Sequence, residues 1–99
     1  MYQATLKVAG GKLLRVNMEL ENVSDDRVIR SIKLTGDFFL HPEDVLPDIE
    51  KALANMGWPA DEDQYVDAIQ IVLDAQRAVF IGVAPLDIAR AILAATEVL

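Results

Sequence analysis

The first third of the chain alternates hydrophobic and polar positions. Apolar side chains occupy every second position on both sides of a glycine pair: Tyr2, Ala4, Leu6 and Val8 before it, and Leu14, Val16, Met18 and Leu20 after it. A period of two residues is typical of strands with one buried face. Because Gly10 and Gly11 tolerate the positive φ angles of a tight turn, the pattern predicts an antiparallel hairpin.

A third segment, from Arg27 to Thr35, follows the polar stretch 22–26 and alternates less regularly. Its apolar positions are interrupted by Arg30. An extra residue in a strand, or a place at the edge of a sheet, produces such an irregularity. We therefore expect a third antiparallel strand that carries a bulge or lies at an edge.

From Pro42 onwards the apolar residues recur at steps of three and four, which is the period of a helix. They are Val45, Leu46, Ile49, Leu53 and Met56. Gly57 and Pro59 end this helix. Pro47 leaves two alternatives: a separate turn precedes it and Pro47 lies in the first helical turn, or the helix is kinked there. We favour the separate turn.

Two further helices are expected in the last 40 residues. Asp61-Glu62-Asp63 precedes the second, and acidic residues stabilise a helix N-terminus. Its apolar stripe consists of Tyr65, Ile69, Val72 and Val79, and it ends at 80–82. Pro85 opens the third helix, from Leu86 to about Val98, which is apolar on several sides.

The predicted fold is α+β: one domain, residues 1–99, with a three-stranded antiparallel meander followed by three helices packed on one face.

Composition narrows the function classes. The 99 residues are 53% hydrophobic and contain no cysteine, which excludes thiolate catalysis, zinc-thiolate sites and iron-sulfur ligation by this chain. The net charge of -7 argues against a nucleic-acid partner. Residues 1–36 carry a net charge of +2 and residues 37–99 a net charge of -9. This asymmetry either guides a charged partner electrostatically or is that of an ordinary solvated surface. No segment resembles a membrane span or a leader, so we expect a soluble cytoplasmic protein.

The candidate catalytic and metal-binding residues have simpler structural explanations. His41 is the only histidine and has no predictable partner for acid-base work. The acidic groups 25–26, 43–44 and 61–63 offer oxygen ligands for magnesium. All three stand where turns and helix starts favour acids, so we expect no metal site and no catalytic residue in this chain.

Two short motifs are better candidates for contact with a partner. Gly10-Gly11-Lys12 lacks the spacing of a phosphate-binding loop and joins two strands, so that Lys12 projects from the rim of the sheet. Phe38 and Phe39 are adjacent at the junction between strand and helix, and neighbouring side chains of an extended segment point to opposite sides. Either one ring is exposed for a partner, or the junction curls and buries both.

Three segments together resemble the accessory domain of lipoate-protein ligases: 10–16 (GGKLLRV), 32–39 (IKLTGDFF) and 81–89 (IGVAPLDIA). They occur in the family's order and span most of the chain. Because a strand follows Met1 directly, the chain resembles the form of this domain that is a separate small protein. At the level of fold alone, the order of elements is also similar to that of iron-sulfur scaffold proteins and sulfur acceptors, but a chain without cysteine cannot carry sulfur.

The resemblance implies a partner and divides the chemistry between two subunits. The catalytic subunit would bind lipoate and ATP with Mg²⁺, hold the catalytic lysine and serve the lipoyl-acceptor domains, whereas this chain would bind no cofactor alone. It would form a heterodimer with that subunit and support formation of lipoyl-adenylate. We expect the following residues to contact the partner: Gly10, Gly11, Lys12, Arg15, Asp37, Phe38 and Phe39. The alternatives are a free-standing small-molecule binding domain and a module that oligomerises through its sheet edge.

Overall fold

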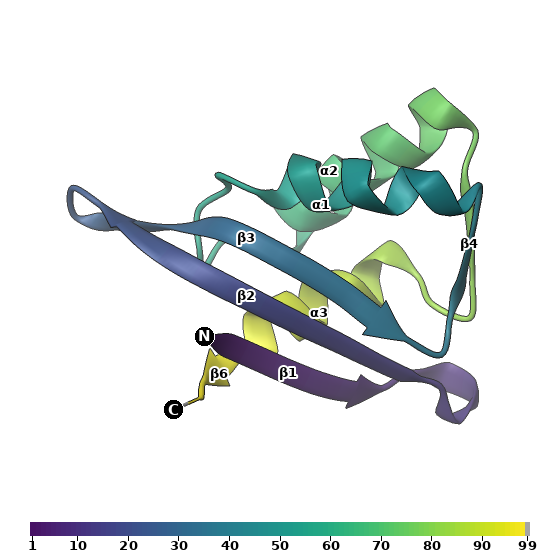
Figure 1. Ribbon diagram of the computed structural model, residues 1–99, viewed down its shortest axis with the longest axis horizontal. Helices are drawn as coiled ribbons and strands as arrows, with labels where there is room; N and C mark the ends of the chain where they lie inside the picture. Colours follow the sequence, from purple (N-terminus) through teal and green to yellow (C-terminus); the bar gives the residue numbers. More distant parts are fainter. Residues whose placement is uncertain (99) are drawn as a thin grey trace.

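An antiparallel sheet with helices on one face makes up most of the computed structural model, which describes residues 1–98 (Figure 1). The strand order is β3-β2-β1-β6. The strands are β1 (Tyr2–Lys7), β2 (Leu13–Val23), β3 (Asp26–Gly36) and β6 (Thr96–Glu97). The expected α+β meander of β1, β2 and β3 is therefore present, with β6 added beside β1.

The other elements form the second layer and a small separate ribbon. The helices are α1 (Leu46–Leu53), α2 (Glu62–Gln76) and α3 (Pro85–Ala94), with short 3-10 turns η1 (Ala9–Gly11) and η2 (Glu43–Val45). The ribbon pairs β4 (Phe39–His41) with β5 (Val79–Ile81). Helix α1 packs on β3, α3 packs on β1 and β2, and α2 packs against the other two helices.

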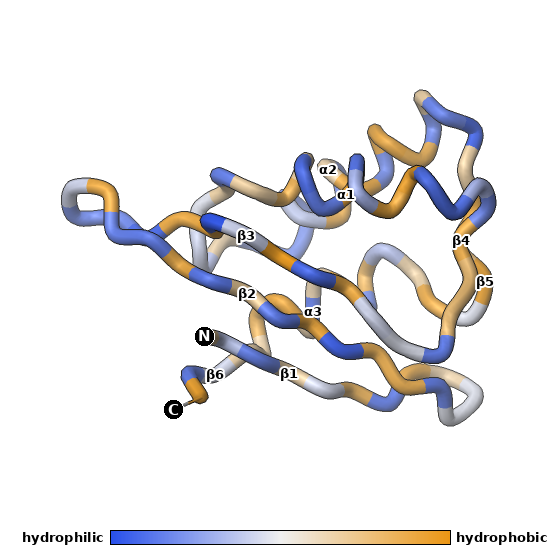
Figure 2. Tube along the Cα trace, viewed as in Figure 1, coloured by the Kyte–Doolittle hydropathy of each residue, from blue (hydrophilic) through white to orange (hydrophobic). Residues whose placement is uncertain are grey.

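The core lies between the sheet and the helices. Apolar and polar residues alternate along β2 in Figure 2, and its apolar set, Leu14, Val16 and Met18, is buried. Tyr65 of α2 is also fully buried, and its hydroxyl donates a hydrogen bond of 2.7 Å to the Gly57 carbonyl. The polar atom of this large side chain is thereby satisfied inside the core.

Both explanations for the irregular third strand apply. The register shifts so that Glu19 faces Ser31 and Leu20 faces Ile29, which leaves Arg30 as the extra residue. In addition, β3 lies at the edge of the sheet. Part of this edge is covered by the loop after α1, because the Ile29 N–H donates to the Met56 carbonyl at 2.9 Å. Such cover protects an edge from unwanted strand pairing.

The predicted turn before the first helix is confirmed. Residues 43–45 form η2, and Pro47 lies in the first turn of α1, where its missing N–H costs no intrahelical hydrogen bond. Three predicted helix ends were wrong. Helix α1 ends at Leu53, before Met56 and Gly57. Helix α2 ends at Gln76, since Arg77 adopts a left-handed conformation with φ of 52° and closes the helix. Helix α3 ends at Ala94 instead of continuing to Val98.

The predicted strand number was also wrong, because three short strands were missed. Val79, which we placed on the apolar stripe of the second helix, and residues 80–81 form β5 and pair with β4. Thr96-Glu97, expected to be helical, forms β6 and pairs with Tyr2-Gln3. Among residues 1–98, no helix has the length and apolar character needed to cross a membrane.

Candidate functional site: a partner-docking surface

The end of β3 is fixed to the start of β2 by a glycine and an aspartate. Gly36 pairs with Leu14 and has a φ of +148°, and a Cβ atom there would overlap the carbonyl oxygen of Leu13. The next residue, Asp37, donates its N–H to that oxygen at 2.8 Å. Its Oδ2 atom accepts the Leu13 N–H at 3.3 Å. This closed pair of hydrogen bonds sets the direction in which the chain leaves the sheet.

The glycine turn between β1 and β2 lies at the same end of the sheet. Gly10 and Gly11 have φ values of +84° and +76°, and no atom lies within 4 Å of a Cβ built on either. Only the backbone conformation, and not lack of space, therefore favours glycine there. The turn is closed by a hydrogen bond of 2.8 Å from the Val8 N–H to the Lys12 carbonyl. Lys12 is exposed and, with Asp37, Phe38 and Phe39, lines a shallow surface groove.

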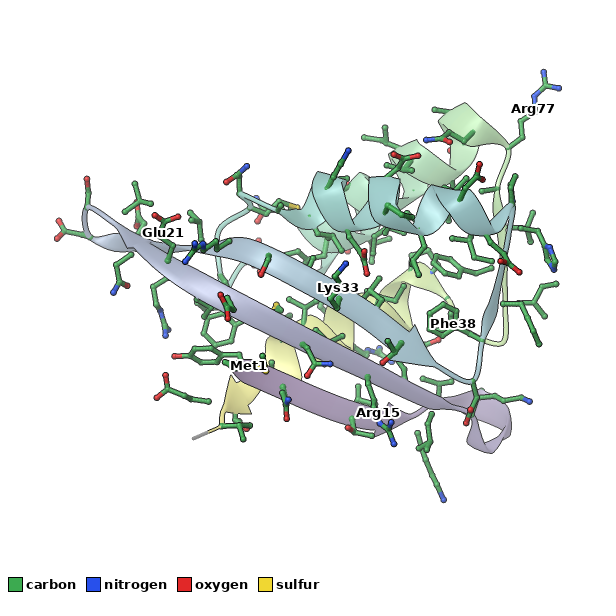
Figure 3. All side chains as sticks on the ribbon, viewed as in Figure 1. Met1, Arg15, Glu21, Lys33, Phe38 and Arg77 are labelled. Carbon is green, nitrogen blue, oxygen red and sulfur yellow. The ribbon has the colours of Figure 1, made fainter. Side chains whose placement is uncertain are left out.

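The two adjacent phenylalanines point to different sides. Phe38 is half-buried (Figure 3). Its ring meets the ring of Phe80 edge-on, with centroids 5.7 Å apart. The Phe39 side chain, in contrast, is 65% exposed. Of the two alternatives, the structure therefore has the one with an exposed ring. Both phenylalanines also border an open groove of about 390 Å³, which reaches Glu43 and Leu46.

Arg15 is separated from these residues. It lies in β2 opposite Thr5 and Thr35, between the buried side chains of Leu14 and Val16, so its side chain leaves the sheet on the face without helices (Figure 3). It does not line either of the two grooves at the phenylalanines. The structure thus brings Lys12, Asp37 and the phenylalanines together but leaves Arg15 on another surface.

Strand β5 adds residues that the sequence patterns did not identify. Phe39 is paired with Ile81, and His41 with Val79. Directly opposed residues of an antiparallel pair point to the same side. The outward side consists of Phe39, His41, Val79 and Ile81, all exposed, and we call it the ribbon face. The consecutive β-branched and aromatic residues at 79–81 were the available signal for a strand.

Within residues 1–98, no group of three or more His, Cys, Asp or Glu side chains is arranged to hold a metal ion. The acidic residues at 61–63 lie at the start of α2, and Glu62 pairs with Arg90 at 3.2 Å. Burial raises the pKa of the Tyr65 hydroxyl, and a backbone hydrogen bond with Ala60 acts in the opposite direction. Tyr65 lies in the core, so this shift concerns stability.

Comparison with known proteins gives one informative similarity. No family model matches the chain, and a search of curated proteins finds no match. Among solved structures, the chain is similar to one from an archaeal lipoylation system, described as a bipartite lipoate protein ligase and its E2 lipoyl domain from Thermoplasma acidophilum. The identity is 29%, the TM-score is 0.69, and the match covers 93% of this chain and 94% of the other. The resemblance to a component of a bipartite lipoate-protein ligase system is thereby confirmed. The likeness to iron-sulfur scaffold proteins stays a prediction.

Proposed function

We propose that this chain, which resembles the small subunit of a bipartite lipoate-protein ligase, is the accessory subunit of such a ligase. The observation that carries the proposal is the similarity to the Thermoplasma acidophilum system over 93% of the chain. In the proposed heterodimer, the catalytic subunit binds lipoate, ATP and Mg²⁺ and later transfers the lipoyl group to an acceptor domain. The accessory subunit supports the first half-reaction, in which lipoate and ATP give lipoyl-adenylate.

The proposed contribution is preorganisation of the catalytic subunit. A docked accessory subunit orders the loops around the adenylation site, so the reacting groups are held in place before reaction. Docking must therefore favour the competent conformation. Raising its population from roughly 1% to roughly 99% requires a differential binding free energy of about 5.5 kcal/mol. An interface of standard size is sufficient for such a difference.

The features of this chain suit a docking role. Exposed aromatic and aliphatic side chains lie together on the ribbon face. Aromatic residues are enriched at interfaces, and the buried centre of an interface is more apolar than the rest of the protein surface. The side chains of the ribbon face are carried by two strands that are hydrogen-bonded to each other, so less backbone has to be ordered on binding. The grooves beside the ribbon are shallow and open, whereas ligand pockets enclose most of a small molecule.

The test is formation of lipoyl-adenylate by the cognate catalytic subunit, with and without an equimolar amount of this chain. We expect strong dependence of the initial rate on the chain. Equal rates in both reactions would reject the proposal. A parallel measurement concerns the free-standing binding domain: lipoate or ATP alone should leave the melting temperature of the isolated chain unchanged, because only a ligand that binds the native state raises it.

A further inference from the structure

We propose that the ribbon face is the surface on which the catalytic subunit docks. The matching surface of the catalytic subunit then has an apolar patch that is surrounded mainly by basic side chains. The inference rests on the proposed function and deepens it. It adds His41, Val79 and Ile81 to the contact residues. It also shifts the centre of the contact from the Gly10-Gly11 turn to the β4–β5 ribbon.

The apolar part of the surface is concentrated in a small area. Phe39, Val79 and Ile81 are 65%, 59% and 52% exposed. They account for three of the eight exposed large hydrophobic residues found in residues 1–98, although the ribbon has only three residue pairs. Single exposed apolar residues are ordinary, but a contiguous group on one side of a sheet is typical of an interaction site.

The inner side of the β4–β5 ribbon packs against the rest of the domain, so the ribbon face on its outer side has a fixed position. Leu40 is buried, and Phe80 packs edge-on against Phe38 with centroids 5.7 Å apart. Gly82 follows β5 with a φ of +93°, and a Cβ there would lie 3.4 Å from the Asp37 carbonyl oxygen. A two-stranded ribbon is only marginally stable by itself, so this backing determines its position. A backbone that is already held in place avoids the cost of ordering a loop when a partner binds.

The charged residues around the ribbon indicate the sign of the net charge on the partner surface. Asp37 precedes β4, and Glu43 and Asp44 follow it. All three are exposed, and none forms an ion pair with another described residue. The nearby cations are Lys12 on the glycine turn and Arg77, which projects outwards at the end of α2 (Figure 3). Since carboxylates outnumber cations, and residues 37–99 carry a net -9, a net basic partner is complementary.

The same charges argue against a second copy of this chain as the occupant. A two-fold symmetric dimer places the same patch of each copy against the other. Docking ribbon face to ribbon face would then bring two carboxylate-rich borders together, and like-charge contacts oppose association. A different protein with basic residues around its apolar patch avoids this repulsion.

The experiment measures the Kd of the cognate catalytic subunit for wild-type chain and three variants by isothermal titration calorimetry. A double variant, Phe39→Ser with Ile81→Ser, removes the apolar centre, and we expect its Kd to rise at least about tenfold. The matched control is Ile71→Ser, because Ile71 is a 69% exposed apolar residue on α2, outside the ribbon. Its Kd should remain within about twofold of wild type. Circular dichroism melting checks that each variant is folded.

A charge variant keeps the inference testable if the double variant is unfolded. Glu43→Lys with Asp44→Lys reverses the charge of the border without changing the apolar side chains, and we expect a higher Kd at low salt and a weaker dependence of Kd on salt. Unchanged affinity in folded variants of both kinds would overturn the inference and leave the proposed function intact. Self-association that the apolar variant abolishes would assign the face to a second copy. A wild-type chain that neither binds nor activates the catalytic subunit would reject the proposed function, and the inference with it.

Discussion

Replacing Gly36 by alanine is expected to destabilise the chain through one well-defined contact. The added Cβ would overlap the Leu13 carbonyl oxygen, and the backbone φ of +148° is unfavourable for any residue with a side chain. Backbone strain of this kind costs about 1–3 kcal/mol. Relief by movement of Leu13 would break its hydrogen bonds with Asp37, each contributing about 1 kcal/mol. The expected loss in the free energy of unfolding is therefore about 2–4 kcal/mol.

Gly10→Ala is the matched control for this prediction. Gly10 also has a positive φ, +84°, but no atom lies within 4 Å of an added Cβ. Only the conformational cost remains, about 1–2 kcal/mol. In a domain of this size each kcal/mol lowers the melting temperature by about 4–8 °C. Thermal unfolding followed by circular dichroism should show a clearly larger decrease for Gly36→Ala. Equal decreases for the two variants would refute the role of the Leu13 contact.

Other predictions concern the sheet edge and the core. Glu50→Ala should lower the free energy of unfolding by about 1.5–3 kcal/mol, because its partly buried carboxylate accepts the Leu34 N–H at 2.9 Å. Lys33→Ala should lower it by less than about 1 kcal/mol, because the Lys33 side chain is 77% exposed. Urea unfolding distinguishes the two variants. Tyr65→Phe removes the hydrogen bond to the Gly57 carbonyl and should cost about 1–2 kcal/mol, which the same assay measures. Because burial raises the pKa of the Tyr65 hydroxyl above 10.0, the unfolded chain releases this proton first as the pH rises. Stability from this group should be complete below pH 10 and decline above it, and a melting temperature that rises over that range would contradict the assignment.

Long segments of the fold were predictable from sequence, and short ones were not. Strands β1 and β2 each contain several alternating positions, so their period of two was evident, and the turn before Pro47 followed from the chemistry of proline. In contrast, β4, β5 and β6 have only two or three residues. Their pairing is determined by tertiary structure, because β4 and β5 are joined across a long stretch of chain that includes two helices.

The same physical reason limited prediction of the site. One exposed ring in the Phe38-Phe39 pair was one of two alternatives that the sequence left open, because adjacent residues of an extended chain point to opposite sides. Only the structure identifies Phe39 as the exposed one. Ile81 and Val79 were invisible as neighbours of Phe39 until the ribbon was known. Arg15 was chosen from its place in a motif, although its alternation with Leu14 and Val16 already indicated the uncovered face of the sheet. Its role in docking stays a prediction.

The most direct test of the proposed function separates the two half-reactions of the ligase. The cognate catalytic subunit is given either lipoate with ATP or preformed lipoyl-adenylate, each with and without this chain, and lipoylation of the acceptor domain is measured. We predict that lipoate with ATP requires the chain, whereas preformed lipoyl-adenylate supports transfer without it. Equal lipoylation from lipoate and ATP in the presence and absence of the chain would contradict its role as the activating accessory subunit.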